Sequence, residues 1–395
     1  MISKEDILKR AAKLLPQQIK LRRLLHQNPE TAFEEFQTTA LLKSHFKKHK
    51  IKTKSLKMKT GLLGIINESK KPAVAIRSDI DALPVTEQTG LSYKSKRDGF
   101  MHACGHDVHT AVVSGAAVLL KDVKNELPGC VKFIFQPAEE MPPGGAQPMI
   151  KEGVLKKPDV INIFGLHVDP TVPVGKFTLR DGPTMASVID FDITIFGVGG
   201  HAALPHRSVD AIAVATELVG SIQKIVSRET NPQKPVVISF GLIRGGTVRN
   251  VIADKVLLQG TARTLFPENM NLIRRLLKRT ADGICKARGA KYELNILSGY
   301  PVLSNHKKVN RILADSAEEL FGKNVISNTP QTMGGEDFAF YLQKVPGAMF
   351  RLGIKNDKIG ANKPWHSPKF IVDEKAIYYG TALLTMAVLR YFEST

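Results

Sequence analysis

The sequence predicts an α/β protein of two domains, in which a small α+β domain is inserted into a larger domain with a mostly parallel sheet. A chain of 395 residues with 43% hydrophobic content can form two cores. In the first half, short apolar runs alternate with segments of helical spacing, as in a parallel sheet covered by helices. From about Val188, the pattern changes to alternating strands with two amphipathic helices.

The larger domain is predicted from runs of apolar residues. Apolar residues at helical spacing predict helices over residues 6–25, 38–49, 106–120 and 307–321. Short apolar runs predict buried strands over residues 62–66, 73–76, 131–135 and 160–166. Because ligands bind at the carboxyl ends of the strands in such sheets, the residues that follow these strands are the candidates for function.

The inserted domain is predicted from the order of its elements. Strands are expected over residues 188–196, 236–242, 255–263 and 291–297, and helices over 208–227 and 269–286. This β-α-β-β-α-β order fits a ferredoxin-like fold. With boundaries near Pro183 and Ser298, the larger domain has a first part over 1–183 and a second part over 299–395, and the insert covers 184–298.

Composition excludes several classes of protein. The first fifteen residues mix apolar and charged positions, so we expect no signal peptide, and no later segment has the length of a membrane span. Cys104, Cys130 and Cys285 are odd in number and irregularly spaced, which argues against disulfides and for a reducing compartment. We therefore expect a cytoplasmic protein with no membrane partner.

The net charge of +19 is compatible with a nucleic acid, a membrane surface, an anionic substrate or a generally basic proteome. The Lys-rich stretch 45–59 alternates basic and apolar residues, and it lacks the interleaved aromatic residues that stack on bases. This pattern favours a solvated face. We expect no specific nucleic-acid partner.

The densest cluster of potential metal ligands lies at residues 101–109, Met-His-Ala-Cys-Gly-His-Asp-Val-His. Cys104 and His106 occupy a Gly-containing loop just before a predicted helix, and such a loop can direct several ligands at one ion. The start of a helix also favours an anionic ligand such as a thiolate. Ordinary loop and cap residues explain the same pattern equally well, so this cluster alone leaves the metal role open.

Other candidate ligands also follow predicted strands. Glu139 and Glu140 come just after the third strand of the larger domain, where one carboxylate can bind a metal while its neighbour transfers a proton. His167 ends the fourth strand, and His366 lies in a loop bounded by prolines. Each residue alone is more often structural. Together with the Cys-x-His pair, they are hard to explain by packing.

Taken in order, these motifs resemble the amidohydrolases that include hippurate hydrolases, plant auxin-conjugate hydrolases and bacterial N-acyl-amino-acid deacylases, relatives of aminoacylase and carboxypeptidase G. The resemblance covers almost the whole chain, from the Leu-Leu-His-Gln-Asn-Pro-Glu segment at 24–30 to His366. The motifs that carry it lie at residues 77–84, 101–109, 136–140, 199–206 and 333–338.

The resemblance implies a metallopeptidase catalytic domain that holds two divalent metal ions, zinc, manganese or cobalt, and an inserted lid domain. It implies metal ligands at Cys104, His106, Glu140, His167 and His366, with Glu139 as the catalytic base. It implies substrate-binding residues in the lid at His201, Asn250 and Arg263. The wider superfamily begins its site with a His-x-Asp pair, whereas this chain has Arg77-Ser78-Asp79, so one usual histidine ligand is missing.

We expect an enzyme that hydrolyses an N-acetyl, N-benzoyl or similar N-acyl-amino acid to the free amino acid and a carboxylic acid. Glu139 would act on a metal-activated water, and Arg263 would pair with the substrate carboxylate. Alternatives within enzymes are a metallocarboxypeptidase or dipeptidase and an N-acetyl-diaminopimelate deacetylase. Outside enzymes, the alternative is a metal-dead or nucleic-acid-binding module. The presence of Glu139 and of all five ligands that the resemblance implies argues against it. A homodimer could form through the free β edge of the lid.

Several polar residues near these motifs are predicted to be structural. His102 and His109 flank the Cys-x-His loop and would orient the ligands or cap the helix. Asp337 would support the site without binding metal, and Trp365 would pack beside His366 rather than on the substrate.

Overall fold

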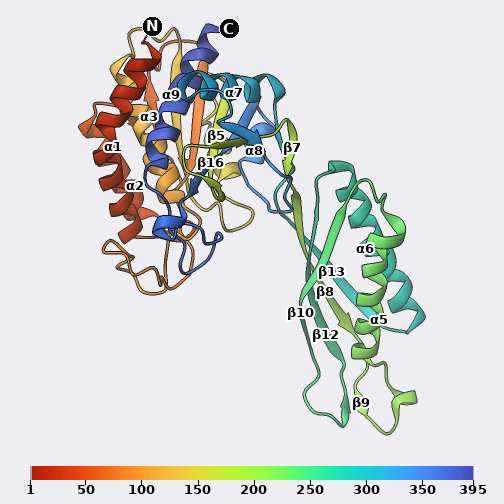
Figure 1. Cartoon of the computed structure of the whole chain (residues 1–395). Helices are drawn as coiled ribbons and strands as arrows, with labels where there is room; N and C mark the ends of the chain where they lie inside the picture. The colour runs from red at the N-terminus through yellow and green to blue at the C-terminus, as the bar shows by residue number, and fades with distance from the viewer. Residues whose placement is uncertain (1, 395) are drawn as a thin grey trace. The chain divides into compact units, whose positions relative to one another are not determined.

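A computed structural model describes residues 2–394, which form two compact units (Figure 1). Unit 1 comprises Met1–Gly182, Ser304–Pro330 and Asp337–Thr395, and unit 2 comprises Pro183–Leu303 and Gln331–Glu336. Met1 and Thr395, the outer ends of the predicted larger domain, lie outside the described residues. Unit 2 extends to Leu303, beyond the predicted boundary near Ser298, and residues 331–336 also belong to it.

Backbone hydrogen bonds explain why the segment 331–336 belongs to unit 2. The N–H of Thr332 donates to the carbonyl of Thr184 at 3.1 Å, and the N–H of Ala186 donates to the carbonyl of Gly334 at 2.9 Å. The segment therefore lies along the first residues of the insert, a long-range pairing that local sequence patterns do not indicate.

Unit 1 contains an eight-stranded sheet in the order β1-β2-β4-β3-β5-β16-β6-β15. Its strands are β1 (Lys52–Lys54), β2 (Leu62–Ile66), β3 (Ala73–Asp79), β4 (Cys130–Gln136), β5 (Val160–Pro173), β6 (Phe177–Leu179), β15 (Ile326–Asn328) and β16 (Gly347–Lys355). The central strands β4, β3, β5 and β16 are parallel, whereas β1, β2 and β4 pair antiparallel. The predicted mostly parallel sheet is confirmed.

Helices cover this sheet. They are α1 (Lys4–Gln27), α2 (Phe36–Lys48), α3 (His106–Asp122), α4 (Ala146–Lys151), α7 (Lys307–Phe321), α8 (Ala339–Leu342) and α9 (Ala376–Glu393), with a 3₁₀ turn η3 at Asp357–Ile359. Helices α1, α3 and α9 pack against one another and lie side by side in Figure 1. The Ala- and Val-rich α3 is buried from His106 to Leu120, which fixes its first turn firmly in the core. Among the described residues, no helix has the length and apolar character needed to cross a membrane.

Unit 2 has the predicted β-α-β-β-α-β order. Its main elements are β8 (Ser187–Phe196), α5 (Ala211–Lys224), β10 (Val236–Gly245), β12 (Lys255–Thr264), α6 (Pro267–Ala287) and β13 (Lys291–Ser298). The strands pair antiparallel in the order β10-β12-β8-β13, which is the ferredoxin-like arrangement. The smaller elements of unit 2 are β9 (Gly200–His201), η1 (Pro205–Arg207), η2 (Ile225–Glu229) and β11 (Val251–Ile252). The strands β7 (Gly182–Met185) and β14 (Leu303–Asn305) pair with each other, and each contains residues of both units.

The predicted end of one strand is wrong. We expected the strand that begins at Val160 to end at His167, but β5 continues to Pro173, so His167 lies inside it. The reason is the neighbouring strand, because β16 pairs with β5 in parallel and its ladder places Arg351 opposite His167 and Lys355 opposite Pro173. This pairing keeps the chain extended beyond the apolar run.

Candidate metal centre and catalytic site

Unit 1 brings the six predicted ligand and base residues into one cluster. Cys104 lies in the loop before α3, His106 begins α3, Glu139 and Glu140 follow β4, His167 lies in β5, and His366 lies in the loop between β16 and α9. Three overlapping groups have donor atoms within 4.8 Å of one another: Cys104 with His106 and His167, Cys104 with Glu140 and His366, and His106 with Glu139 and Glu140. Because the groups share members, the six side chains form a continuous cluster.

The loop that carries Cys104 depends on a glycine. Gly105 has a φ of 89°, and a Cβ added there would lie 2.5 Å from the side chain of Val168. A larger residue would therefore be both strained and obstructed at this turn. The His366 loop is fixed to the same segment, since the N–H of His366 donates to the carbonyl of Ala103 at 2.9 Å. The two ligand loops thus hold each other in place.

The ring of His106 is oriented with one nitrogen towards the cluster. Its Nδ1 lies 3.0 Å from the carbonyl oxygen and 3.1 Å from Oδ1 of Asp81, so Nδ1 carries the proton. Its Nε2 is buried and has no hydrogen-bond partner among residues 2–394, and it lies 3.9 Å from Oε1 of Glu140. A buried imidazole nitrogen that faces carboxylates in this way fits a metal ligand.

Cys104 and His167 present soft and borderline donors to the same space. The Sγ of Cys104 lies 3.5 Å from Nε2 of His167, whose Nδ1 donates to the carbonyl of Val168 at 2.8 Å. Burial holds the pKa of His167 well below its ordinary value, with His109 adding to the effect, so the ring is neutral and able to bind metal. Burial and the nearby Glu140 raise the pKa of the Cys104 thiol. A bound cation would oppose that effect and favour the thiolate.

The two glutamates complete the cluster. Oε1 of Glu140 lies 3.3 Å from Nε2 of His366, and Oε2 of Glu139 lies 4.0 Å from Nε2 of His106. Burial opposes ionisation of Glu140, yet its pKa is lowered overall because His366 and His106 favour the carboxylate. One thiol, three imidazoles and two carboxylates form a donor set that fits two borderline divalent cations.

The motif at residues 77–84 supplies partners to which the sequence analysis assigned no role. Oδ2 of Asp81 accepts the N–H of Glu140 at 3.0 Å, in addition to the contact of Asp81 with His106. Asp79 is fully buried and accepts from Nη1 of Arg77 at 2.7 Å. The signal in the sequence was that Asp79 ends a buried strand and a second aspartate follows two residues later, since extended residues two apart point to the same side.

Other polar residues near the cluster have structural contacts. Nδ1 of His109 lies 2.6 Å from Oδ1 of Asp79, and its Nε2 accepts the N–H of Val168 at 2.9 Å. Through these two hydrogen bonds, His109 links Asp79 of β3 to Val168 of β5. Asp337 accepts from Nη2 of Arg77 at 2.7 Å. Trp365 donates its ring N–H to the carbonyl of Val168 at 3.0 Å, and its ring packs against that of His167.

Within unit 2, the structure brings together two of the three predicted substrate-binding residues. His201 lies in β9 and is exposed, and the N–H of the adjacent Ala202 donates to the carbonyl of Asn250 at 3.1 Å. Arg263 lies near the end of β12, where its Nη1 donates to the carbonyl of Met333 at 3.0 Å. His201 and Asn250 are therefore neighbours.

Arg263 lies in the four-stranded sheet of unit 2, at the end away from the β9–β11 pair that contains His201. It pairs with Val188 at the start of β8, whereas Lys255 pairs with Phe196 at the end of β8. Eight residue steps of about 3.3 Å separate these two pairs, which corresponds to roughly 26 Å along the strand. Because His201 follows Phe196 in the chain and lies in the β9–β11 pair beyond this end of the sheet, a small molecule cannot touch both His201 and Arg263 of one unit 2.

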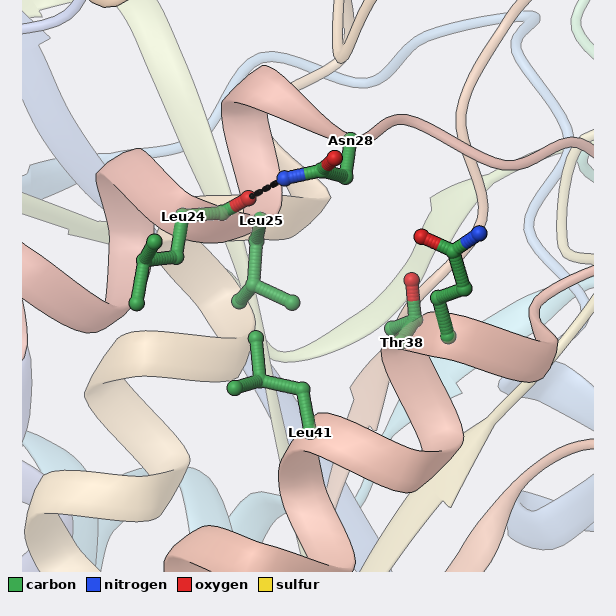
Figure 2. A pocket seen from close by; sticks show the side chains of 6 residues that line it. Leu24, Leu25, Asn28, Thr38 and Leu41 are labelled. Carbon is green, nitrogen blue, oxygen red and sulfur yellow. Dashed lines mark hydrogen bonds between the residues drawn. The ribbon is translucent and has the colours of Figure 1, made fainter.

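A pocket between α1 and α2 is separate from this chemistry (Figure 2). The side chains that line it are those of Leu24, Leu25, Asn28, Gln37, Thr38 and Leu41. The side-chain amide of Asn28 bonds to another residue of the pocket, because its Nδ2 donates to the carbonyl of Leu24 at 2.9 Å. The pocket contains none of the predicted site residues.

Comparison with known proteins gives consistent matches over most of the chain. The family model described as peptidase family M20/M25/M40 matches residues 75–390. The chain is 41% identical to N-acetyl-L-cysteine deacetylase of Bacillus subtilis, covering 96% of this chain and 89% of that protein. It is 37% identical to N-acetyldiaminopimelate deacetylase of Priestia megaterium, covering 95% of this chain and 97% of that protein. The crystal structure of the YXEP protein of Bacillus subtilis, a dinuclear metal-binding peptidase of the M20 family, superposes with a TM-score of 0.84 at 34% identity, covering 97% of this chain and all of that one.

Proposed function

Because the chain belongs to peptidase family M20/M25/M40, we propose that it is a metal-dependent amidohydrolase that cleaves N-acyl-amino acids to the free amino acid and a carboxylic acid. The observation that carries this proposal is the cluster of thiol, imidazole and carboxylate donors in unit 1. The relatives named as deacetylases of acylated amino acids support the substrate class.

We assign the metal ligands by their donor atoms. Two divalent cations, zinc, manganese or cobalt, would be held by Cys104, His106, Glu140, His167 and His366. When bound, such ions polarise an amide carbonyl and lower the pKa of a water molecule towards about 7.

Glu139 is proposed as the general base. Its carboxylate is buried and lies at the edge of the cluster, 4.0 Å from Nε2 of His106. From there it can accept a proton from the attacking water and pass it to the leaving amine, a function worth roughly 10²- to 10⁴-fold in rate. Glu139→Gln keeps the size of the side chain and removes the base.

The substrate contacts are assigned to unit 2. Arg263 would bind the carboxylate of the amino acid through its planar guanidinium, and His201 with Asn250 would contact the scissile amide. Because roughly 26 Å of strand separates Arg263 from the end of the sheet next to His201, one copy of unit 2 supplies one of these contacts to a given substrate. We therefore propose a homodimer in which the second copy supplies the other contact.

The sheet of unit 2 has a free edge suited to such a dimer. The order β10-β12-β8-β13 leaves β10 at one edge, and the exposed apolar residues Ile243 and Val248 lie on or next to it. Mixing two inactive variants, Glu139→Gln and His201→Ala, tests this arrangement. Mixed dimers would regain activity if His201 acts on the partner's site, and no recovery would show that it acts within its own chain.

The function is tested by turnover. Purified protein is assayed with N-acetyl-methionine, hippurate, N-acetyl-diaminopimelate and a dipeptide, before and after chelation and after zinc, manganese or cobalt is restored. We expect metal-restored hydrolysis of an N-acyl-amino acid that is lost in Glu139→Gln. Hydrolysis of the dipeptide alone would instead identify a dipeptidase. We also propose a cytoplasmic location, which the three free, buried cysteines support.

A further inference from the structure

Ala138, the residue immediately before the proposed base, has an unusual backbone conformation. Its φ is 56°, in the left-handed region, and its side chain is fully buried. A residue with a Cβ rarely adopts this conformation because the Cβ comes too close to the following carbonyl. The conformation directs the chain from β4 into Glu139 and Glu140, so contacts that maintain it also orient the base.

Both backbone polar groups of Ala138 are fixed by hydrogen bonds. Its N–H donates to Oε1 of Glu35 at 2.9 Å, and its carbonyl accepts the N–H of Gly145 at 3.1 Å. A Cβ at Gly145 would lie 2.0 Å from the carbonyl oxygen of Pro137, so only glycine fits on that side. The side chain of Glu35 holds the other side of the turn.

Glu35 is itself anchored far from Ala138 in sequence. It occupies the N-cap position of α2 and is fully buried. The same Oε1 accepts the N–H of Phe33 at 3.1 Å, and Phe33 also has a positive φ, of 61°. One oxygen atom therefore holds the amides of two residues that are both in the left-handed conformation.

We propose that Glu35 is a positioning residue, whose Oε1 holds Ala138 in the left-handed conformation and thereby orients the carboxylate of Glu139. This inference rests on the proposed role of Glu139 as the base. The contact passes through the backbone, so the hydrogen-bond acceptor is the required feature and a negative charge is not. In agreement, burial, with Asp81 nearby, raises the pKa of Glu35 to about 7.

Three substitutions at Glu35 separate the acceptor from the charge. Glu35→Gln keeps an oxygen acceptor and removes the charge. Glu35→Asp keeps the charge and withdraws the acceptor by about 1.5 Å, the length of one carbon–carbon bond. Glu35→Met fills the site without an acceptor. The matched control is Glu30→Asp, because Glu30 is also buried and accepts the backbone N–H groups of Gln37 and Thr38, which begin α2.

The measurements are kcat and KM with an N-acyl-amino acid, metal content, and hydrogen exchange of the 137–145 segment in metal-free protein. We expect Glu35→Gln to keep kcat within threefold. Glu35→Asp and Glu35→Met should lower kcat 10- to 100-fold, since a 1 Å misplacement can reduce a rate about 100-fold. Both variants should keep a KM within twofold of wild type and should bind two metal ions per chain. In both, the amides of residues 137–145 should exchange their hydrogens faster than in wild type. Glu30→Asp should leave kcat unchanged.

Two results would overturn the inference. One is a Glu35→Asp enzyme that keeps full kcat while Glu35→Gln loses it, which would show that charge is the required property. The other is a rate of hydrogen exchange in residues 137–145 that equals that of wild type in both Glu35→Asp and Glu35→Met. If Glu35→Met does not fold, the comparison of Asp with Gln decides the question. If the wild-type protein hydrolyses no N-acyl substrate, the proposed function fails, and hydrogen exchange still tests whether Glu35 holds the turn.

Discussion

Oδ1 of Asp81 lies 3.1 Å from Nδ1 of His106. The other carboxylate oxygen of Asp81 accepts the N–H of Glu140 at 3.0 Å. A single buried carboxylate therefore fixes the ring of one proposed ligand and the backbone of another. Through Asp81, the end of β3 sets the spacing between the start of α3 and the turn after β4.

Asp81→Asn should weaken metal binding. An amide can satisfy only one of the two N–H groups that Asp81 now accepts, so His106 or Glu140 loses its alignment. We expect a 10- to 100-fold loss of zinc affinity, the range typical for partners that orient metal ligands. Titration against a competing chelator measures the affinity. The control is Asp373→Asn, because Asp373 is also a buried carboxylate and accepts from the side chain of Asn356. If Asp81→Asn keeps a zinc affinity within twofold of wild type, the prediction is wrong.

Cys104→Ser should change the metal preference. The thiolate is the softest donor in the cluster, and a hydroxyl in its place suits harder ions. We expect zinc affinity to fall at least tenfold while manganese affinity changes less, so that the ratio of the two affinities shifts towards manganese. Equilibrium dialysis with both metals gives this ratio. Unchanged affinity for both metals would mean that Cys104 is not a ligand.

His45→Gln should reduce the loss of stability in acid. Burial, together with the neighbouring His49 and Lys48, lowers the pKa of His45 from 6.5 to about 4 in the folded protein. The unfolded chain therefore binds more protons between pH 4 and pH 6.5, and folding stability falls as the pH decreases through this range. Since one pKa unit corresponds to about 1.4 kcal/mol, His45 accounts for a loss of about 2–3 kcal/mol.

Urea unfolding of wild type and His45→Gln at pH 7.5 and pH 4.5 tests this prediction. The variant should lose less stability than wild type between the two pH values. Parallel losses in the two proteins would show that His45 does not titrate differently in the folded and unfolded states.

Lys132→Met should destabilise unit 1. The ammonium group of this fully buried lysine donates to the carbonyls of Val154, Lys156 and Pro158 at 3.1, 2.7 and 2.9 Å. Methionine fills the space but leaves these carbonyls without their donor, which should reduce the free energy of unfolding by about 2–4 kcal/mol. Lys70→Met, at a partly exposed lysine that donates to one carbonyl, should change it by less than about 0.5 kcal/mol in the same denaturant titration.

The elements that were predicted well are those with strong local patterns. β2 and α7 have the predicted bounds. A short run of apolar residues marks β2, and an amphipathic repeat that ends just before Gly322 marks α7. The order of elements in unit 2 was also readable, since its strands alternate and its helices are amphipathic. The ligand cluster was predictable for a related reason. Parallel strands place residues from distant segments at one edge of the sheet, and the family motifs marked those residues.

The features that were missed depend on contacts between distant segments. The extension of β5 past His167 comes from its pairing with β16, and the separation of His201 from Arg263 comes from the strand register. The role of Asp81 depends on where α3 begins relative to β3. Such relationships follow from packing in three dimensions, which hydrophobic periodicity does not encode.

The central position of β5 has a consequence for how the protein is made. β5 is a 14-residue, largely buried strand that pairs with β3 on one side and β16 on the other. The ribosome synthesises β3 before β5, but it synthesises β16 only after the whole of unit 2. During that interval one edge of an apolar strand has no partner, and such edges recruit other chains. We therefore expect fragments that end within unit 2 to expose this edge of β5, and to aggregate more readily than fragments that extend past β16.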